Sequence, residues 1–495
     1  MKRWITDRIK GVNQSLAQVT WVGLIMVLCA ALLQYYLNGD HVNRDGVLYL
    51  FQAHAVNAGE FSAVRDLYPN VIFAQLIAFL QSSINLTYAT AAHGVGLIFF
   101  MVSSFFFLEI LKLISSDPFL LICGVIMLLT SLALDKYLVM ILRDHALWAG
   151  LMAMSYYFIR WSQEQGVFYL ILSLGSAGLA GIFRSEALSL IPVLLFLAAW
   201  LLYHTRQDLS FPKSLIAKGL LITLVGLGLF VMAGTHFSYA KLGELVHRAI
   251  GAITNLTQPL PIHTNHHWLA QLLKDYPLLM KWSFFTTLIL FKWMTAVGLI
   301  GLFLCALGLR AETIKVQPNT RLFLFSILVV TLVWPILNLF STHVLTSRYL
   351  VPQLWLLMIF MAIGLHQLWT SGQAGQNKLL TLAQAAAALL LLIRFFDVMI
   401  DSHQSSIDQE VGRWSLENNI NLDQTYAPNL RVRYYMDNLT IPTQNLTEAL
   451  NDSSIRWFIV DQSINNHAAQ SLTMIKSFPQ DKPAKLYIYE REHAD

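Results

Sequence analysis

The chain has 495 residues, of which 56% are hydrophobic and only 13% are charged, and its mean hydropathy is +0.54. A soluble protein carries roughly a quarter charged residues, so this composition indicates an integral membrane protein. The formal net charge of +4 gives no sign of nucleic-acid binding. Cys29, Cys123 and Cys305 lie inside apolar runs without metal or redox spacing, so a disulfide framework is not implied.

Long apolar runs recur along most of the chain. A membrane-spanning helix needs about 20 apolar residues, and about eleven runs meet that length. The first run lacks a small-residue cleavage site, so we expect it to remain in the protein. The expected spans are 17–37, 87–114, 119–140, 145–160, 167–183, 187–203, 215–235, 282–308, 322–341, 349–370 and 379–399. The stretch 70–82 is too short to cross and is expected to lie along the interface.

Positive charges in short loops predict the orientation. The N-terminus "MKRWITDRIK" is basic and is therefore expected in the cytoplasm, and an odd number of spans puts the tail outside. The loops 38–86 and 236–281 are then also outside. Several cations nonetheless fall at outer positions, against the usual bias, and an anionic ligand at the outer face would explain them. These are Arg44, Arg65, Lys136, Arg143, Arg184, Lys241, Arg248, Lys274 and Arg348.

The tail, 401–495, differs in composition from the rest. The segments "GRWSLENN", "RVRYYMDNL", "SSIRWFIVDQ" and "AKLYIYERE" indicate a helix alternating with short aromatic and β-branched strands. The expected fold class is therefore an all-α polytopic membrane protein over 1–400, followed by a small α/β domain over 401–495 on the extracytoplasmic side.

An acid and a base stand together in the first outer loop, "NRDGVLYLFQAHAVNAGEF". Asp45 occupies the position of a helix N-cap, which would be a structural role. Arg44 is less easily explained, because a cation at a helix N-terminus opposes the helix dipole and would be better satisfied by a phosphate. The apolar residues that follow have helical spacing and predict a short helix lying on the membrane: Val47, Leu50, Phe51, Ala55 and Ala58.

A second outer corner, "LDKYLVMILRDHALW", carries charges on both sides of a short apolar stretch. Asp135 and Lys136 precede the stretch, and Arg143, Asp144 and His145 follow it. Long side chains reaching the interface, with local ion pairs, would explain them structurally. Alternatively, they form an acidic and basic cluster that faces the same site as the first loop.

Two further corners hold ionisable residues at the ends of spans. Arg184 and Glu186, in "GIFRSEALSL", lie close to bilayer depth, where such residues usually pair or line a cavity. In "THVLTSRYLVP", Arg348 and Tyr349 end a span. A single arginine there is commonly an anchor, but with the other outer cations Arg348 becomes a candidate phosphate ligand.

The longest outer loop, 236–281, contains three histidines, and His266 and Lys274 are candidates for contact with a ligand that the loop covers. The histidine spacing matches no strong metal motif, so no metal cofactor is expected.

Taken in order, these motifs resemble the GT-C membrane glycosyltransferases. The segment "RDGVLYLFQA" followed by Tyr68 and Pro69 is similar to the first-loop motif, within the protein mannosyltransferase and aminoarabinose transferase group (glycosyltransferase family 39-like). "LRDHALW", "FRSEALSLIP" and "SRYLVPQLW" resemble later outer-corner motifs of that group. The tail, with "RVRYYMDN" and "IRWFIVDQ", resembles the extracytoplasmic domain of its bacterial members.

The resemblance implies a bacterial inner-membrane enzyme with a periplasmic C-terminal domain. It further implies a polyprenyl-phosphate-linked sugar as donor and an acceptor hydroxyl on a lipid, glycan or protein. Asp45 would be the catalytic base, and the lipid phosphate would be bound by Arg44, Lys136, Arg143, Arg184 and Arg348. The remaining candidates for substrate binding are Tyr68, Asp144, Glu186, Tyr349, His266 and Lys274. The first loop lacks the paired acids of many members, which argues against metal dependence.

Two other functions remain open on the residues alone. A lipid or sugar transporter would show internal repeats and broken helices at the bilayer midplane, and the sequence shows no repeat. An O-antigen ligase or polymerase also places arginines in large outer loops, although without the acidic first loop and an α/β tail.

Overall fold

The computed structural model describes residues 2–38, 42–62, 70–205, 250–251, 254–255, 276–311, 314, 316–342, 345–373, 388–389, 391–393, 407–439, 445–461, 472–478 and 486–491. The chain divides into two compact units. Unit 1 comprises Met1–Gln34, Leu97–Leu138 and Arg143–Ile400. Unit 2 comprises Tyr35–Gly96, Val139–Leu142 and Asp401–Asp495, so it joins the predicted first outer loop to the tail. The predicted domains 1–400 and 401–495 stay a prediction.

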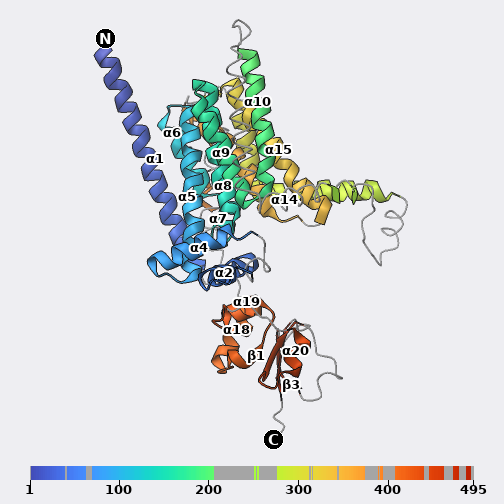
Figure 1. Cartoon of the computed structure of the whole chain (residues 1–495). Helices are drawn as coiled ribbons and strands as arrows, with labels where there is room; N and C mark the ends of the chain where they lie inside the picture. Colours follow the sequence, from blue (N-terminus) through green and yellow to red (C-terminus); the bar gives the residue numbers. More distant parts are fainter. Residues whose placement is uncertain are drawn as a thin grey trace. The chain divides into compact units, whose positions relative to one another are not determined.

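Unit 1 is helical (Figure 1). Its elements are α1 (Lys2–Asn38, which continues into unit 2), α5 (Tyr88–Ile114, which begins in unit 2), α6 (Pro118–Leu129), α7 (Leu132–Leu138), α8 (Asp144–Glu164), α9 (Val167–Phe183), η1 (Ser185–Ser189), α10 (Leu190–Thr205), α14 (Pro277–Leu309), α15 (Pro318–Thr342), η2 (Ser347–Leu350) and α16 (Val351–Gln373). Within the described residues, 6 helices are long and apolar enough to cross a membrane. The predicted polytopic helical class is confirmed. The number of eleven spans stays a prediction, because 215–235 and most of 379–399 lie outside the described residues.

The predicted span 119–140 is wrong as a single helix. Asp117 caps α6 by accepting the Phe119 N–H at 2.9 Å, and the helix ends after 12 residues at Leu129. The Thr130 hydroxyl then donates to the Ile126 carbonyl at 2.8 Å. Ser103 and Ser104 make the same kind of bond inside the continuous helix α5, so hydroxyl groups alone do not explain the break. The chain continues in the short helix α7.

The helices α14 and α16 pack with their backbones in contact. A Cβ atom added at Gly308 would lie 1.9 Å from the Phe360 carbonyl oxygen, and one at Gly364 would lie 1.9 Å from that of Leu304. Small residues at such crossings are typical of helices that associate in membranes. Further along α14, Gly298 has φ 73° and interrupts the helix, a conformation that favours glycine.

In unit 2, α2 (Arg44–Asn57) packs on α4 (Ile72–Ile84), with the rings of Tyr49 and Phe73 edge to face at 5.1 Å. The helix predicted after Asp45 is confirmed. Of its expected apolar face, Val47, Leu50, Phe51 and Ala55 are buried, whereas Ala58 is exposed just after the helix. Tyr49 and Gln52 are buried too, so α2 is enclosed on more than one side. The stretch 70–82 forms the 13-residue helix α4, and its position at the interface stays a prediction.

The tail forms the predicted α/β domain (Figure 1). Its elements are α18 (Ile407–Glu417), η3 (Leu422–Gln424), β1 (Thr425–Tyr426), α19 (Leu430–Tyr435), α20 (Leu446–Asn451), β2 (Trp457–Val460), β3 (Leu472–Phe478) and β4 (Leu486–Arg491). The strand order is β1-β2-β4-β3, with β1 parallel to β2 and the other pairs antiparallel. The segment "RVRYY" forms a helix rather than a strand, because the Asn429 side chain accepts the Arg431 N–H at 3.0 Å and starts α19.

Both faces of this sheet are covered. Because successive side chains of a strand point to opposite faces, Ile459 packs with Val411 and Val432 from α18 and α19, whereas Phe458 packs with Ala449 from α20. The alternation in β2 therefore places one helical layer on each side.

Candidate functional site

A buried ion pair joins the start of one apolar helix to the end of the next. An Asp144 Oδ1 at the first residue of α8 lies 2.7 Å from a terminal guanidinium nitrogen of Arg184, the residue that ends α9. Their side chains are only 4% and 5% exposed. Arg184 has extended backbone (φ −139°, ψ 109°), so the helix stops there and its side chain is directed independently of the helical face.

Three more side chains converge on this pair from neighbouring elements of unit 1. Glu186, in η1, has a carboxylate oxygen 4.0 Å from the other terminal nitrogen of Arg184. Tyr349, in η2, contacts two cations, because the guanidinium carbon of Arg184 lies 5.1 Å from its ring centre and that of Arg348 lies 5.5 Å away. Arginine stacks well on aromatic faces, so Tyr349 holds both groups in one place.

The charged neighbours of Asp144 determine the direction of its pKa shift. Burial raises the pKa of Asp144, but the guanidinium groups of Arg184, Arg348 and Arg143 oppose it, and the pKa ends below its ordinary value. Asp144 lies outside the six candidate spans and is a carboxylate at neutral pH. Three guanidinium groups thus gather around two carboxylates, which is an arrangement suited to a further anion.

The link between α7 and α8 supports the cluster. His145 is fully buried, and its Nε2 lies 3.0 Å from the Tyr137 carbonyl oxygen. The His145 ring packs edge to face on Trp148 at 4.8 Å. The Tyr137 side chain also hydrogen-bonds to the Ser347 side chain, so α7 is tied to η2, which carries Arg348.

The structure thus brings together Asp144, Arg184, Glu186, Arg348 and Tyr349, and the electrostatic contact of Asp144 with Arg143 adds a sixth member. We call these six residues the arginine cluster. Lys136, another predicted phosphate ligand, is exposed on α7. Tyr68, His266 and Lys274 lie outside the described residues.

The predicted base Asp45 belongs to unit 2. The prediction that it stands at the N-cap is wrong, because α2 begins at Arg44 and its N-cap is Asn43. Asp45 instead lies in the first turn, where a carboxylate still favours the helix dipole. Its side chain is half-buried and that of Arg44 is exposed. Their catalytic and phosphate-binding roles stay predictions.

Within the described ranges, no group of three His, Cys, Asp or Glu side chains could hold a metal ion. The three histidines of the loop 236–281 are outside those ranges, so the expectation of no metal stays a prediction.

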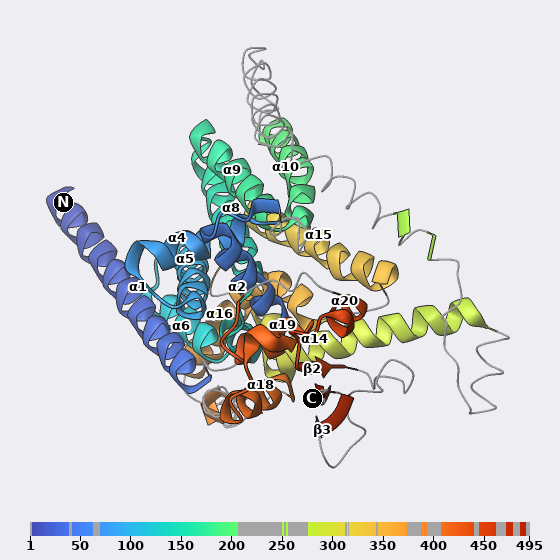
Figure 2. The ribbon, with the colours of Figure 1, turned by 60° about the horizontal axis from the view of Figure 1, so that its bottom comes forward.

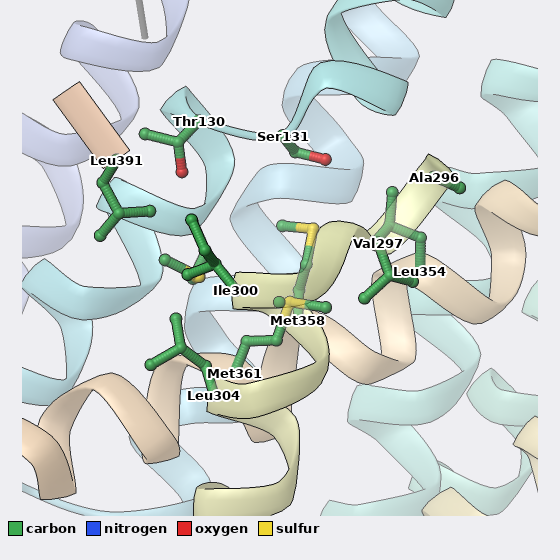
Figure 3. A pocket seen from close by; sticks show the side chains of 12 residues that line it. Thr130, Ser131, Ala296, Val297, Ile300, Leu304, Leu354, Met358, Met361 and Leu391 are labelled. Carbon is green, nitrogen blue, oxygen red and sulfur yellow. The ribbon is translucent and has the colours of Figure 1, made fainter. Parts of the chain in front are cut away.

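A pocket in unit 1 lies beside the break in α14 (Figure 3). Its only polar side chains are those of Thr130 and Ser131, and no lining residue is charged. The cavity volume is about 20 Å³, enough for about one water molecule, so the pocket is a small packing void without a charged group for a phosphate. Its lining residues are Met127, Thr130, Ser131, Ala296, Val297, Ile300, Gly301, Leu304, Leu354, Met358, Met361 and Leu391.

Sequence reasoning overlooked Tyr137, which connects α7 to η2. A tyrosine directly after a lysine near the end of an apolar run is typical of the membrane interface and could have drawn attention to it. The sequence also left open whether Arg184 pairs with Glu186. The structure shows that the closer partner of Arg184 is Asp144, from another helix.

No protein-family model matches the sequence, and no curated protein matches it. Among solved structures, the chain is similar to the oligosaccharyltransferase of Archaeoglobus fulgidus, crystallised with a tethered acceptor peptide that contains an NVT sequon. The TM-score is 0.45 with 10% sequence identity, over 88% of this chain and 69% of that one. At this similarity no residue role transfers from that enzyme to this chain.

Proposed function

We propose that the protein is an integral membrane glycosyltransferase of the GT-C type. It transfers a sugar from a polyprenyl-phosphate donor to an acceptor hydroxyl on the outer face of the membrane, with inversion at the anomeric carbon. The observation that carries this proposal is the arginine cluster, in which Arg184 and Arg348 share the ring of Tyr349 at the ends of apolar helices. Ionisable groups at such depth are costly and usually serve a function.

The chemistry requires a cationic site for the leaving group. When the bond between sugar and phosphate breaks, negative charge grows on the lipid phosphate, and preorganised guanidinium groups stabilise it. Arg348 and Arg143 are half-buried and are our first candidates for direct phosphate contact. Asp144 and Glu186 fix the orientation of Arg184, which therefore needs little rearrangement when the donor binds.

The acceptor hydroxyl must lose a proton as it attacks the anomeric carbon. We propose Asp45 as the base, because a carboxylate that lies within hydrogen-bond reach of the hydroxyl can accept its proton. Its half-buried position in the first turn of α2 is compatible with that role. The acceptor is a lipid, a glycan or a protein, and no nucleotide takes part at this face.

The test uses full-length protein in detergent with a lipid extract from the source membranes as donor. Arg348→Met should lower the rate of donor consumption by roughly 100-fold or more, as expected when a charge-stabilising group is lost. Arg310→Met is the matched control, because it removes an exposed cation of unit 1 that has no assigned role and should change the rate little. Equal rates for the two variants would contradict the assignment.

Comparing surface lipids, glycans and proteins with and without the gene by mass spectrometry identifies the sugar and the acceptor. Asp45→Asn should abolish transfer while the protein still accumulates in the membrane. Unchanged transfer by this variant would refute Asp45 as the base.

One observation favours a second candidate function. The interruption of α14 at Gly298 lies within an apolar helix, and broken helices are typical of transporters. A transporter moves its substrate unchanged, so turnover of a sugar-lipid in detergent, where no gradient exists, separates the two functions.

A further inference from the structure

We propose that Tyr435 in the tail domain is a positioning residue for the loop that carries Asp45, so that the tail is part of the transfer machinery. This inference rests on the proposed function, because it assigns Tyr435 a role through Asp45. We call residues 42–46, which comprise the two residues before α2 and the first turn of α2, the Asp45 loop. All the contacts described below lie within unit 2.

The first contact joins the tail to the start of the Asp45 loop. The Val42 N–H donates to the Tyr435 hydroxyl oxygen at 3.2 Å, and Val42 is only 1% exposed. A buried backbone N–H requires a partner, and here a side chain 393 positions later in the sequence supplies it. The helices α2 and α19 lie beside each other in both views (Figures 1 and 2).

A second anchor holds the next residue of the loop. The Asn43 side chain donates from Nδ2 to the Ile141 carbonyl at 3.3 Å and accepts the Ile141 N–H on Oδ1 at 2.8 Å. This pair of bonds explains why Asn43 does not cap α2 with its side chain. Gly46 packs against the same two residues, since a Cβ atom added there would lie 2.8 Å from both Asn43 Oδ1 and Ile141 Cβ.

Tyr435 is itself held firmly by the tail. A Cβ atom at Gly412 in α18 would meet Tyr435 Cβ at 2.4 Å and its carbonyl carbon at 2.8 Å, so the two helices touch. Asp408 binds both the Arg431 guanidinium, at 3.0 Å, and the Asn429 amide, at 2.9 Å. The backbone and Cβ of Tyr435 are therefore fixed by packing within the tail, which limits where its hydroxyl can lie.

Asp45 follows these two anchors directly and begins the helix that they orient. A general base must lie within hydrogen-bond reach of its proton, and a displacement of about 1 Å can cost roughly 100-fold in rate. The tail thus contributes to catalysis without touching substrate, through one hydrogen bond to the loop that precedes the base.

The experiment removes only the Tyr435 hydroxyl, with Tyr435→Phe in full-length protein. Two quantities are measured: kcat and KM with the lipid-extract donor, and hydrogen exchange of the peptide spanning 42–51. We expect kcat to fall roughly 10- to 100-fold while the donor KM changes by less than about two-fold, since donor binding is not affected. Exchange in the peptide should accelerate, while exchange in the tail sheet should stay unchanged.

Tyr426→Phe is the matched control, because it deletes a hydroxyl in the same domain, from β1 in the cluster around Phe458. It should leave kcat and the exchange of the Asp45 loop as in the wild type. Equal kcat for the two variants overturns the inference, as does faster exchange throughout the tail of Tyr435→Phe, which indicates general loosening. If the wild-type protein transfers no sugar, the proposed function fails, and unchanged exchange in the loop overturns the positioning contact separately.

Discussion

Replacing Asp144 with asparagine should destabilise unit 1 strongly. The variant keeps the size of the side chain but removes the charge that lies 2.7 Å from Arg184, whose own side chain is 5% exposed. Breaking a buried ion pair on one side costs about 3–5 kcal/mol, because the remaining charge stays buried. Glu186, at 4.0 Å from the same guanidinium, offsets part of this loss. We therefore expect about 3 kcal/mol, roughly a 100-fold change in the ratio of folded to unfolded protein.

The assay is reversible unfolding in mixed micelles with increasing SDS, followed by tryptophan fluorescence. A double variant, Asp144→Leu with Arg184→Met, removes both charges and should be far more stable than the sum of the single losses predicts, because no uncompensated charge remains. The reasoning is refuted if Asp144→Asn unfolds at the wild-type SDS fraction. It is equally refuted if the double variant loses as much free energy of unfolding as the two single variants lose together.

The same pair predicts the pH dependence. The folded-state pKa of Asp144 lies below its ordinary value, because the arginines outweigh the effect of burial. Its stabilisation is therefore fully present above the unfolded-state pKa of about 3.9 and is lost as pH falls through the folded-state value. Between pH 5 and 8 this group should contribute no pH dependence to the free energy of unfolding, which SDS titrations at several pH values can check.

Three further changes test the packing and the caps. Gly308→Ala should destabilise by about 3 kcal/mol or more, because its Cβ would overlap a backbone carbonyl of α16, whereas Gly178→Ala, with open space around it, should be neutral or slightly stabilising. Asp117→Ala should cost about 1 kcal/mol more than Asp117→Asn, since asparagine keeps the cap of α6 and loses only the carboxylate that contacts His366. Asn445→Ala removes the capping box of α20 and should lower tail stability by about 1 kcal/mol.

The first two comparisons use the SDS titration, and the third follows hydrogen exchange in the tail strands. Similar unfolding of the two glycine variants would show that α14 and α16 separate easily. Equal stability of the two Asp117 variants would mean that the contact between the Asp117 carboxylate and His366 Nε2 (2.7 Å), rather than the cap, carries the stabilisation. A tail unaffected by the loss of Asn445 would contradict the role of the capping box.

Hydrophobic run length predicted most helices of unit 1, because the cost of exposing backbone groups in lipid leaves the chain few alternatives. It did not predict the break after Leu129, because the length of an apolar run does not distinguish one long helix from two short ones. In the tail, composition predicted two of the strands but assigned "RVRYY" to the wrong class. The Asn429 cap, a local signal, outweighed β-propensity there.

The members of the arginine cluster stood out individually in the sequence, since charges at span ends are conspicuous. Which residues would pair could not be predicted. Asp144 meets Arg184 because α8 packs on α9, and the sequence spacing of the two residues does not indicate that contact. The anchors of the Asp45 loop were harder still. A hydrogen bond from Val42 to Tyr435 leaves no pattern in either segment.

That last contact also orders events during synthesis. Val42 leaves the ribosome 393 residues before the tyrosine that satisfies its N–H, a delay of roughly 20 to 80 s at the usual rate of translation. The helices can insert in the meantime, but the residues in front of Asp45 acquire this anchor only after the tail has folded. On the proposed role of Asp45, a nascent chain would thus remain inactive until the tail is in place.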